Sequence, residues 1–127
     1  MKKHITKVVS FVLLLLILLS LTACSRKIEK SDIAGEWKWS SHYNNVLKVQ
    51  CFNTLLLKAD GTFSEVVADP VMGTVYWEDE GTWYWDEEDM EVRLKSDGSS
   101  GTTVFKYDEK SNTLYQDDEI VYTKEGY

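Results

Sequence analysis

From residue 35 to the C-terminus, short runs rich in aromatic and β-branched residues alternate with turn signals about every ten residues. Asp60-Gly61 is a strong hairpin signal, and the Asp69-Pro70 pair and the loop 96–101 break the chain further on. No stretch of this region carries a sustained helical period. The spacing therefore predicts an all-β domain in which a small antiparallel meander closes into a barrel or packs as a sandwich.

The runs define the expected strands and the extent of the domain. They are residues 36–41, 47–58, 62–68, 74–78, 82–85, 90–95, 102–107, 113–116 and 119–124. This pattern corresponds to about eight or nine strands. We assign the domain to residues 34–127, a length that holds one hydrophobic core.

The N-terminus has the composition of a secretory signal. Three lysines precede the apolar run 8–19, which only Ser10 interrupts. A basic start, a short apolar run and small residues at its end are typical of an export signal. The run is shorter than the roughly 20 apolar residues that a transmembrane helix needs. We therefore expect residues 1–23 to be a signal peptide that takes no part in the fold.

The end of this segment, Leu21-Thr22-Ala23-Cys24, resembles the lipobox of bacterial lipoproteins. The resemblance implies that the Cys24 thiol carries a diacylglyceryl group, with palmitate-type chains, and that cleavage occurs before it. Two acyl chains are what stable anchoring requires. We expect a lipoprotein of the bacterial cell membrane that faces the extracytoplasmic side, with residues 24–33 as a short tether. The alternative is an ordinary secretory cleavage beside an incidental cysteine.

Loss of the signal makes the chain strongly acidic. The whole chain has 14 basic and 21 acidic side chains, and residues 1–23 hold three of the lysines and none of the acids. The mature part therefore carries 11 basic against 21 acidic side chains, a net charge of −10. Such a surface repels phosphate backbones, and no basic stripe is present, so we expect no nucleic-acid binding. The charge suits a basic protein or peptide as partner, through electrostatic steering.

No catalytic constellation is apparent in the mature chain. Its one histidine, His42, lies among polar residues at a strand end, without a motif that supplies a nucleophile and an orienting group. No phosphate-binding glycine loop or zinc-ligand spacing is present, so we expect neither enzyme activity nor a cofactor. With Cys24 acylated, Cys51 has no disulfide partner in the chain, and we interpret it as a small buried core residue.

Two acidic runs, residues 78–80 and 86–89, raise the question of a calcium site. Calcium loops carry acids at alternate positions with a glycine turn, whereas the acids here are consecutive. We interpret both runs as solvated turns at hairpin tips, where charge discourages edge-to-edge strand pairing. We therefore expect no metal site.

The tryptophans are the main candidates for a binding site. Trp37 with Trp39, and Trp83 with Trp85, form Trp-x-Trp pairs, so both members of a pair lie on one face of a strand. If that face is the interior, the four side chains line a cavity for a small hydrophobic or aromatic ligand. The alternative is that they fill the barrel, because a small barrel has just enough interior for side chains.

Several short motifs resemble those of a known family. Gly35-Glu36-Trp37 resembles the Gly-x-Trp of lipocalins, and the segment 59–63 with Gly81-Thr82-Trp83 is similar to the pattern of small bacterial lipocalin-like lipoproteins. The resemblance covers most of residues 33–125. It implies a meander barrel with Trp37 across its base and Arg93 or a lysine packed on that tryptophan. The chain is shorter than a typical lipocalin and lacks a Thr-Asp-Tyr motif, which implies a smaller lumen.

Two functions from different classes remain open. The first is a membrane-anchored lipocalin-like protein that binds a small hydrophobic or aromatic ligand between the four tryptophans. The second is a surface immunity or decoy lipoprotein that sequesters a basic toxin or peptide. Its contacts would come from the acidic surface and from Tyr76, Trp77 and Tyr84, which we place on other faces of their strands. Ionic strength separates the two, because salt screens a steered encounter between charged surfaces but not the capture of an apolar ligand.

Overall fold

The computed structural model describes residues 27–117 and 120–124. The predicted signal peptide and Cys24 lie outside the described residues. The described chain consists of one short helix and eight strands. They are α2 (Lys30–Ile33), β1 (Gly35–Asn44), β2 (Val49–Leu57), β3 (Thr62–Ala68), β4 (Val75–Asp86), β5 (Glu91–Ser96), β6 (Thr102–Asp108), β7 (Thr113–Gln116) and β8 (Ile120–Lys124).

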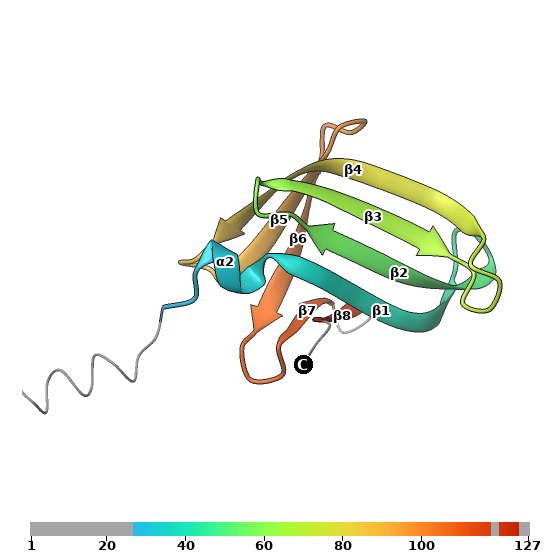
Figure 1. The fold of residues 1–127 in the computed structure, drawn as a ribbon, viewed down its shortest axis with the longest axis horizontal. Helices are drawn as coiled ribbons and strands as arrows, with labels where there is room; N and C mark the ends of the chain where they lie inside the picture. The colour runs from blue at the N-terminus through green and yellow to red at the C-terminus, as the bar shows by residue number, and fades with distance from the viewer. Residues whose placement is uncertain (1–26, 118–119, 125–127) are drawn as a thin grey trace, which may run out of the picture.

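The eight strands form one closed barrel in sequence order (Figure 1). Each strand is antiparallel to the next, and β8 returns to pair with β1. The prediction of an all-β domain built as a small antiparallel meander barrel is therefore confirmed, with the lipocalin-like closure of the sheet on itself. Among the described residues, no helix combines the length and the apolar composition needed to cross a membrane.

Strand β4 explains why there are eight strands and not nine. The runs 74–78 and 82–85 belong to one continuous strand, and the acidic run between them pairs with β3 through Glu65 opposite Asp79. The interpretation of residues 78–80 as a hairpin tip was wrong. Consecutive acids fit within a strand because alternate side chains point to opposite faces, so only some of them leave the solvent. The run 86–89 does lead into a turn, between β4 and β5.

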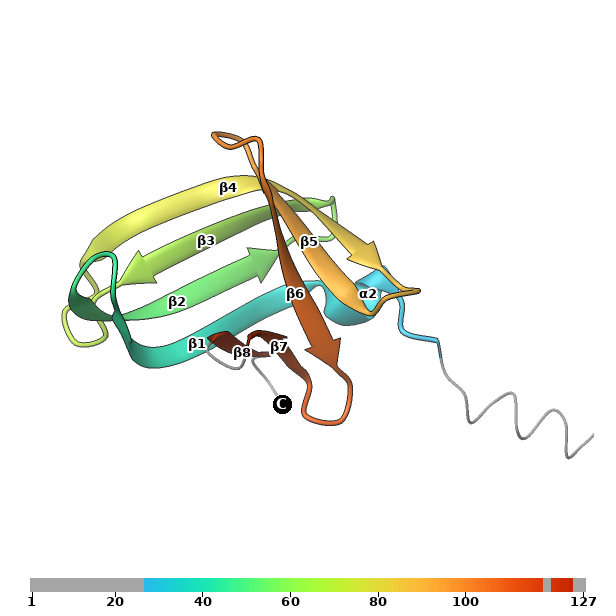
Figure 2. The same cartoon turned by 180° about the vertical axis from the view of Figure 1, so that it is seen from behind.

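The strands differ in length, and this divides the barrel into two ends. Strand β5 pairs with β4 only from Gly81 to Asp86, so the first half of β4 extends beyond it. Within the described residues, strand β8 meets β1 at two residue pairs, both near the start of β1. Figures 1 and 2 show β1, β2, β3 and β4 reaching past the shorter strands on the side away from α2. We call this side, with the turns 45–48 and 69–74, the open end, and the side with α2 the closed end.

The hydrophobic core fills the closed end and the middle of the barrel. It consists of Ile33, Trp37, Leu55, Leu57, Phe63, Trp83, Trp85, Val92, Leu94, Phe105, Leu114 and Tyr122. We expect the segment of residues 27–127, which contains all of these core residues and the partly buried Ile28, to fold by itself, as a cooperative thermal unfolding transition would show. We refer to it as the barrel domain.

Helix α2 closes the barrel and was not predicted, because four residues carry too little periodicity. The backbone N–H of Glu29 donates to Asp32 Oδ2 over 2.9 Å, which fixes the first turn, and Ile33 is fully buried in the core. The tether predicted for residues 24–33 therefore differs from the structure in its second half. From Ile28 onward this segment packs on the barrel.

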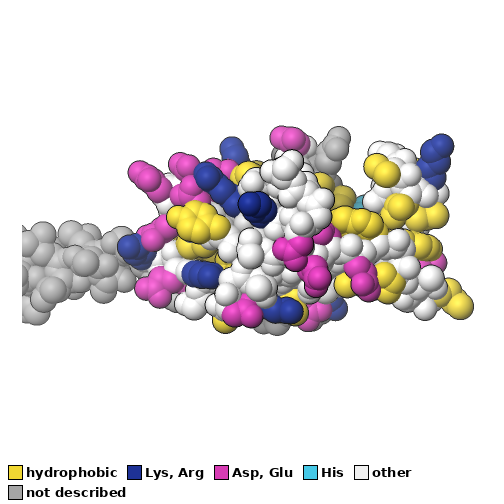
Figure 3. Space-filling view, turned by 90° about the horizontal axis from the view of Figure 1, so that it is seen from above, with side chains coloured by type: hydrophobic (Ala, Val, Ile, Leu, Met, Phe, Trp, Pro, Cys, Tyr) yellow, Lys and Arg dark blue, Asp and Glu magenta, His cyan; other side chains and the backbone are white. Residues whose placement is uncertain are grey.

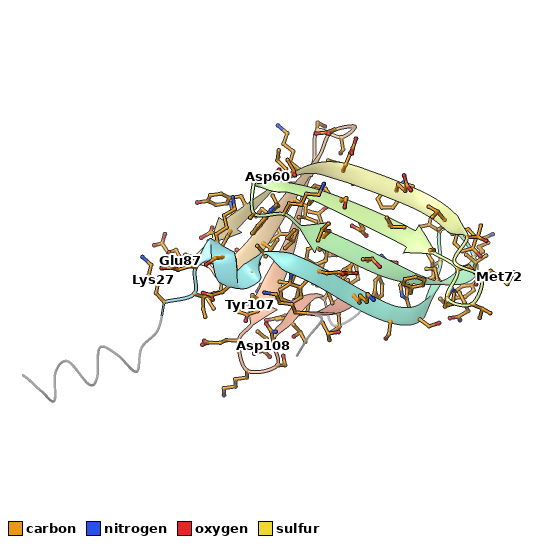
Figure 4. The ribbon with its side chains drawn as sticks, viewed as in Figure 1. Lys27, Asp60, Met72, Glu87, Tyr107 and Asp108 are labelled. Atoms are coloured by element: carbon orange, nitrogen blue, oxygen red, sulfur yellow. The ribbon has the colours of Figure 1, made fainter. Side chains whose placement is uncertain are left out.

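The two ends also differ in their surfaces. At the closed end, the Lys27 ammonium lies 3.2 Å from the Glu87 carboxylate, and Figure 4 labels both side chains there, with Met72 at the far tip. Hydrophobic side chains gather at the open end, on the right of Figure 3. The exposed residues of its turns and of the start of β4 include Val46, Leu47, Val71, Met72, Val75 and Trp77.

Gly81 is required where β4 crosses from the open end into the core. A Cβ atom at this position would lie 2.0 Å from the backbone oxygen of Lys95 and 2.9 Å from Phe63 Cε1. We expect Gly81→Ala to lower the free energy of unfolding by about 2–3 kcal/mol, because backbone and not a flexible side chain must move. Urea denaturation measures this. Gly98→Ala, with no atom within 4 Å of the added Cβ, is the control, and equal effects of the two changes would contradict the explanation.

Candidate binding cavity at the open end

Three of the four candidate tryptophans lie in the closed end. Trp37, Trp83 and Trp85 are all buried, and Trp37 is completely so. Each indole N–H donates to a backbone carbonyl, as a buried tryptophan needs. The acceptors are Ile33 at 2.9 Å, Lys58 at 2.7 Å and Ile28 at 3.0 Å, in the same order. These three side chains therefore have a structural role. Trp37 joins the barrel to α2, Trp83 joins it to the β2–β3 turn, and Trp85 joins it to the segment before α2.

The basic residue over the first tryptophan is Lys124. Its ammonium lies 5.8 Å from the centre of the Trp37 ring and donates to the backbone carbonyl of Asp32 over 2.6 Å. Of the two possibilities that the resemblance implied, the structure has a lysine. Arg93 instead lies on the outside of β5, where its guanidinium contacts Asp86 Oδ2 at 2.8 Å.

Trp39 is the candidate tryptophan that lies at the open end. It is half-buried and stacks on the ring of His42, with centroids 3.3 Å apart and planes 8° apart. Across the barrel, Trp77 points inward from β4, because it is an even number of residues from Trp83 and Trp85 on one strand. The assignment of Trp77 to an outer face was wrong. It could have been placed correctly from the sequence if β4 had been treated as one strand.

A cavity lies between Trp39 and Trp77. It consists of an inner hollow of about 200 Å³ and an outer hollow of about 330 Å³. Both are lined by Trp39, Trp77, Asn53, Glu65 and Ile120, so the two lie next to each other. Further lining residues are Phe63, Leu94, Phe105 and Tyr122 for the inner hollow, and Val46, Leu47 and Val67 for the outer one. The cavity therefore has aromatic and aliphatic walls and opens at the tips of the long strands.

Three polar side chains of the cavity form a triad on strands β2, β3 and β8, and the inner hollow is also lined by the polar residues Asp79, Ser96, Thr103 and Gln116. Asn53 Nδ2 donates to Tyr122 Oη over 3.0 Å and to Glu65 Oε1 over 3.2 Å, and Tyr122 Oη–H donates to the same Glu65 oxygen over 3.0 Å. Asn53 is only 5% exposed. Among the described residues, its Oδ1 has no hydrogen-bond partner. A buried acceptor without a partner costs free energy, and this one belongs to a side chain that lines both hollows.

The electrostatics of the triad are set by Glu65 and Asp79. Burial raises the pKa of Glu65 above its ordinary value, the hydrogen bonds from Tyr122 and Asn53 oppose that rise, and the Asp79 charge adds to it. Asp79 lies directly opposite Glu65 in the β3–β4 ladder and is bonded to the Ser96 hydroxyl. Burial and the Glu65 charge also raise the pKa of Tyr122, so its hydroxyl stays protonated and acts as a donor.

His42 and Cys51 form a pair that the sequence did not predict. They are opposite each other across β1 and β2, with Cys51 Sγ 3.5 Å from His42 Nε2. His42 Nδ1 lies 3.0 Å from the Ser40 carbonyl and so carries the proton, which leaves Nε2 to accept from the thiol. Burial raises the pKa of the Cys51 thiol, and the residue is fully buried, as expected. The pair was missed because a bulge between Trp39 and His42 shifts the register of β1.

One group of acidic side chains has the spacing of a metal site. Asp86, Asp89 and Glu91 bring their carboxylates within 4.8 Å of one another at the outside of the β4–β5 turn. The Arg93 guanidinium lies 2.8, 3.6 and 3.8 Å from them, in the same order. The arginine therefore already supplies the positive charge that this group needs.

Comparisons of the chain with models of protein families, with curated proteins and with solved structures found no match. The function must therefore be argued from the geometry of the cavity.

The raised pKa of Glu65 predicts a dependence of stability on pH. A carboxyl whose pKa is higher in the folded than in the unfolded state stabilises the fold below the unfolded pKa. That contribution is lost as pH rises through the folded pKa. We expect Glu65→Gln, which keeps the acceptor for Asn53 and Tyr122 but does not ionise, to be more stable than the wild type near neutral pH.

The advantage of Glu65→Gln should shrink as the pH falls towards about 4, the ordinary pKa of a glutamate. Thermal unfolding across this range measures it. The control is Glu109→Gln, an exposed change in the β6–β7 turn, for which we expect little effect on the melting temperature at any pH. A Glu65→Gln advantage that is the same at every pH would contradict the burial argument.

Proposed function

We propose that the protein is a membrane-anchored extracytoplasmic lipoprotein whose lipocalin-like barrel binds a small hydrophobic or aromatic ligand. The observation that carries the binding role is the cavity between Trp39 and Trp77, which is closed below by the core and open above. Ligand sites are typically concave, mostly apolar and equipped with a few convergent polar groups. The cavity has these features, with the Asn53–Glu65–Tyr122 triad as the polar group.

The exposed hydrophobic residues at the open end support an apolar ligand. Val46 is 90% exposed and Trp77 47% exposed, and both line the outer hollow. Exposing many apolar side chains to water costs free energy. A contiguous exposed group of them marks a surface that another apolar group covers. A ligand that enters between the two turns would cover part of this surface.

The position of the chain's start supports the anchored arrangement. The first described residue, Lys27, lies at the closed end, and Cys24 precedes it by three positions (Figure 4). A lipid on Cys24 would hold the closed end near the bilayer. The cavity would then open on the side away from the membrane, towards the medium.

The proposed role involves no catalysis. The one histidine of the mature chain, His42, is stacked on Trp39 and accepts a hydrogen bond from the Cys51 thiol, whose pKa burial raises. A nucleophilic cysteine requires the opposite, a lowered thiol pKa.

The anchor is tested by Cys24→Ala. We expect the change to move the protein from the membrane fraction to the soluble or secreted fraction, because without the lipid no apolar anchor is left in the mature chain. Cell fractionation followed by immunoblotting measures this. Cys51→Ala is the matched control and should leave the distribution unchanged. Retention of the Cys24→Ala protein on the membrane after signal cleavage would refute the lipoprotein proposal.

Binding is tested with an uncharged apolar fluorophore, N-phenyl-1-naphthylamine, added to the barrel domain. We expect a saturable rise in fluorescence that is the same at low and high salt. Trp39→Ala should weaken it about tenfold, since an aromatic wall is lost. Tyr84→Ala, which removes a ring that is 63% exposed on the outside of β4, should not. A non-saturable signal, or equal effects of the two changes, would contradict a ligand-binding cavity at this place.

A second function, sequestration of a basic toxin or peptide, is favoured by one further observation. A groove of about 560 Å³ beside β3 and β4 is lined by five acidic side chains and by no basic one among the described residues. The acids are Glu65, Glu78, Asp79, Glu80 and Asp97. A basic partner steered to this groove would bind more weakly as salt rises, in contrast to the apolar ligand.

A further inference from the structure

The wall of the cavity carries two partly buried acidic side chains that no basic side chain balances. Glu65 and Asp79 face each other across the β3–β4 ladder, and both line the inner hollow. Like charges in directly opposed positions destabilise a sheet. Among the described residues, none of those lining either hollow is a lysine, arginine or histidine. The fold therefore keeps two facing carboxyl groups on the cavity wall without a basic partner, at a cost in stability when both are ionised.

The same place contains two free hydrogen-bond acceptors. Asn53 Oδ1 is buried and unpartnered among the described residues. The hydrogen bonds from Asn53 and Tyr122 both go to Glu65 Oε1, so Glu65 Oε2 remains available. Because the Asn53 amide nitrogen is committed to Glu65 and Tyr122, the Asn53 side chain cannot turn its donor towards the cavity without breaking both bonds. A ligand that supplies hydrogen-bond donors and a positive charge would therefore complement the cavity.

We propose that the ligand carries a protonated amine on a small apolar or aromatic body. This inference rests on the proposed binding function and names its substrate class. An ammonium group offers three donors and no acceptor, which matches Asn53 Oδ1 and Glu65 Oε2. Its charge compensates the facing carboxylates of Glu65 and Asp79. The apolar body lies between Trp39 and Trp77, whose ring faces also attract a cation.

Ligands of other kinds complement the polar groups of the cavity less well. A neutral hydrocarbon leaves the Asn53 acceptor buried without a partner and the carboxylates uncompensated. A carboxylic acid or phosphate ester adds negative charge beside Glu65 and Asp79, which raises the repulsion already present. The charge of the cavity therefore decides between ligands of the same size and shape.

The test uses the barrel domain, wild type and variant, near neutral pH with isothermal titration calorimetry. The probes are 2-phenylethylamine, its anionic counterpart 3-phenylpropionate and its uncharged counterpart propylbenzene. We expect the amine to bind at least tenfold more tightly than either of the others. Glu65→Gln should weaken amine binding by about tenfold to a hundredfold, in the range for a hydrogen bond to a charged group. Asn53→Leu should also weaken it.

The matched control is Glu109→Gln, which removes one negative charge at the closed end and should leave amine affinity unchanged. If the three probes bind equally and Glu65→Gln has no effect, the amine proposal is overturned while the binding function stands. If none of the probes binds up to its solubility limit, and N-phenyl-1-naphthylamine does not bind either, both are overturned. A variant that is lost to misfolding is recognised from its melting temperature, which for Glu65→Gln should exceed that of the wild type near neutral pH.

Discussion

The burial of Trp37 is the interaction on which the rest of the barrel depends. Its indole N–H is bonded to the carbonyl of Ile33, its ring meets Tyr107 edge to face at 6.2 Å, and Lys124 lies over it from the last strand. One side chain thus joins α2, the first strand and the last. With this end filled by aromatic residues, the remaining interior volume is confined to the open end, and the cavity owes its position to that division.

The cavity and the core differ in how their polar groups are hydrogen-bonded. The closed end satisfies every indole N–H with a backbone carbonyl, whereas the open end keeps the Asn53 oxygen without a partner and two carboxylates face to face. A barrel of this size could be filled by apolar residues throughout. Residues that lower stability in one confined place, next to a cavity, are typical of a site whose chemistry is completed by a ligand.

The sequence predicted the architecture well because turn signals and alternation are local properties. Asp60-Gly61 and the Trp-x-Trp pairs placed strands correctly, and Gly35-Glu36-Trp37 indicated the closed end. The cavity was less predictable, because it depends on register between distant strands. Nothing local shows that Asn53 meets Tyr122, or that Glu65 opposes Asp79 within what looked like a turn. Likewise, the sequence does not show that Trp37 is sealed in the core while Trp39, two residues further along the same face of β1, lines the cavity.

The seam between β1 and β8 has consequences for motion. Among the described residues, the pairs at this seam are Trp37 with Lys124 and Lys38 with Thr123, whereas β1 and β2 are paired along most of their length. A short ladder at the point of closure is the part of a barrel with the lowest free energy of local opening. Ile120, at the other end of β8, is one of the walls of the cavity. Parting of β1 and β8 beside Ile120 alone would thus widen the cavity, while Tyr122 stays in the core and Trp37 keeps the first and last strands paired. A ligand would then enter through the seam and not past a hinged lid.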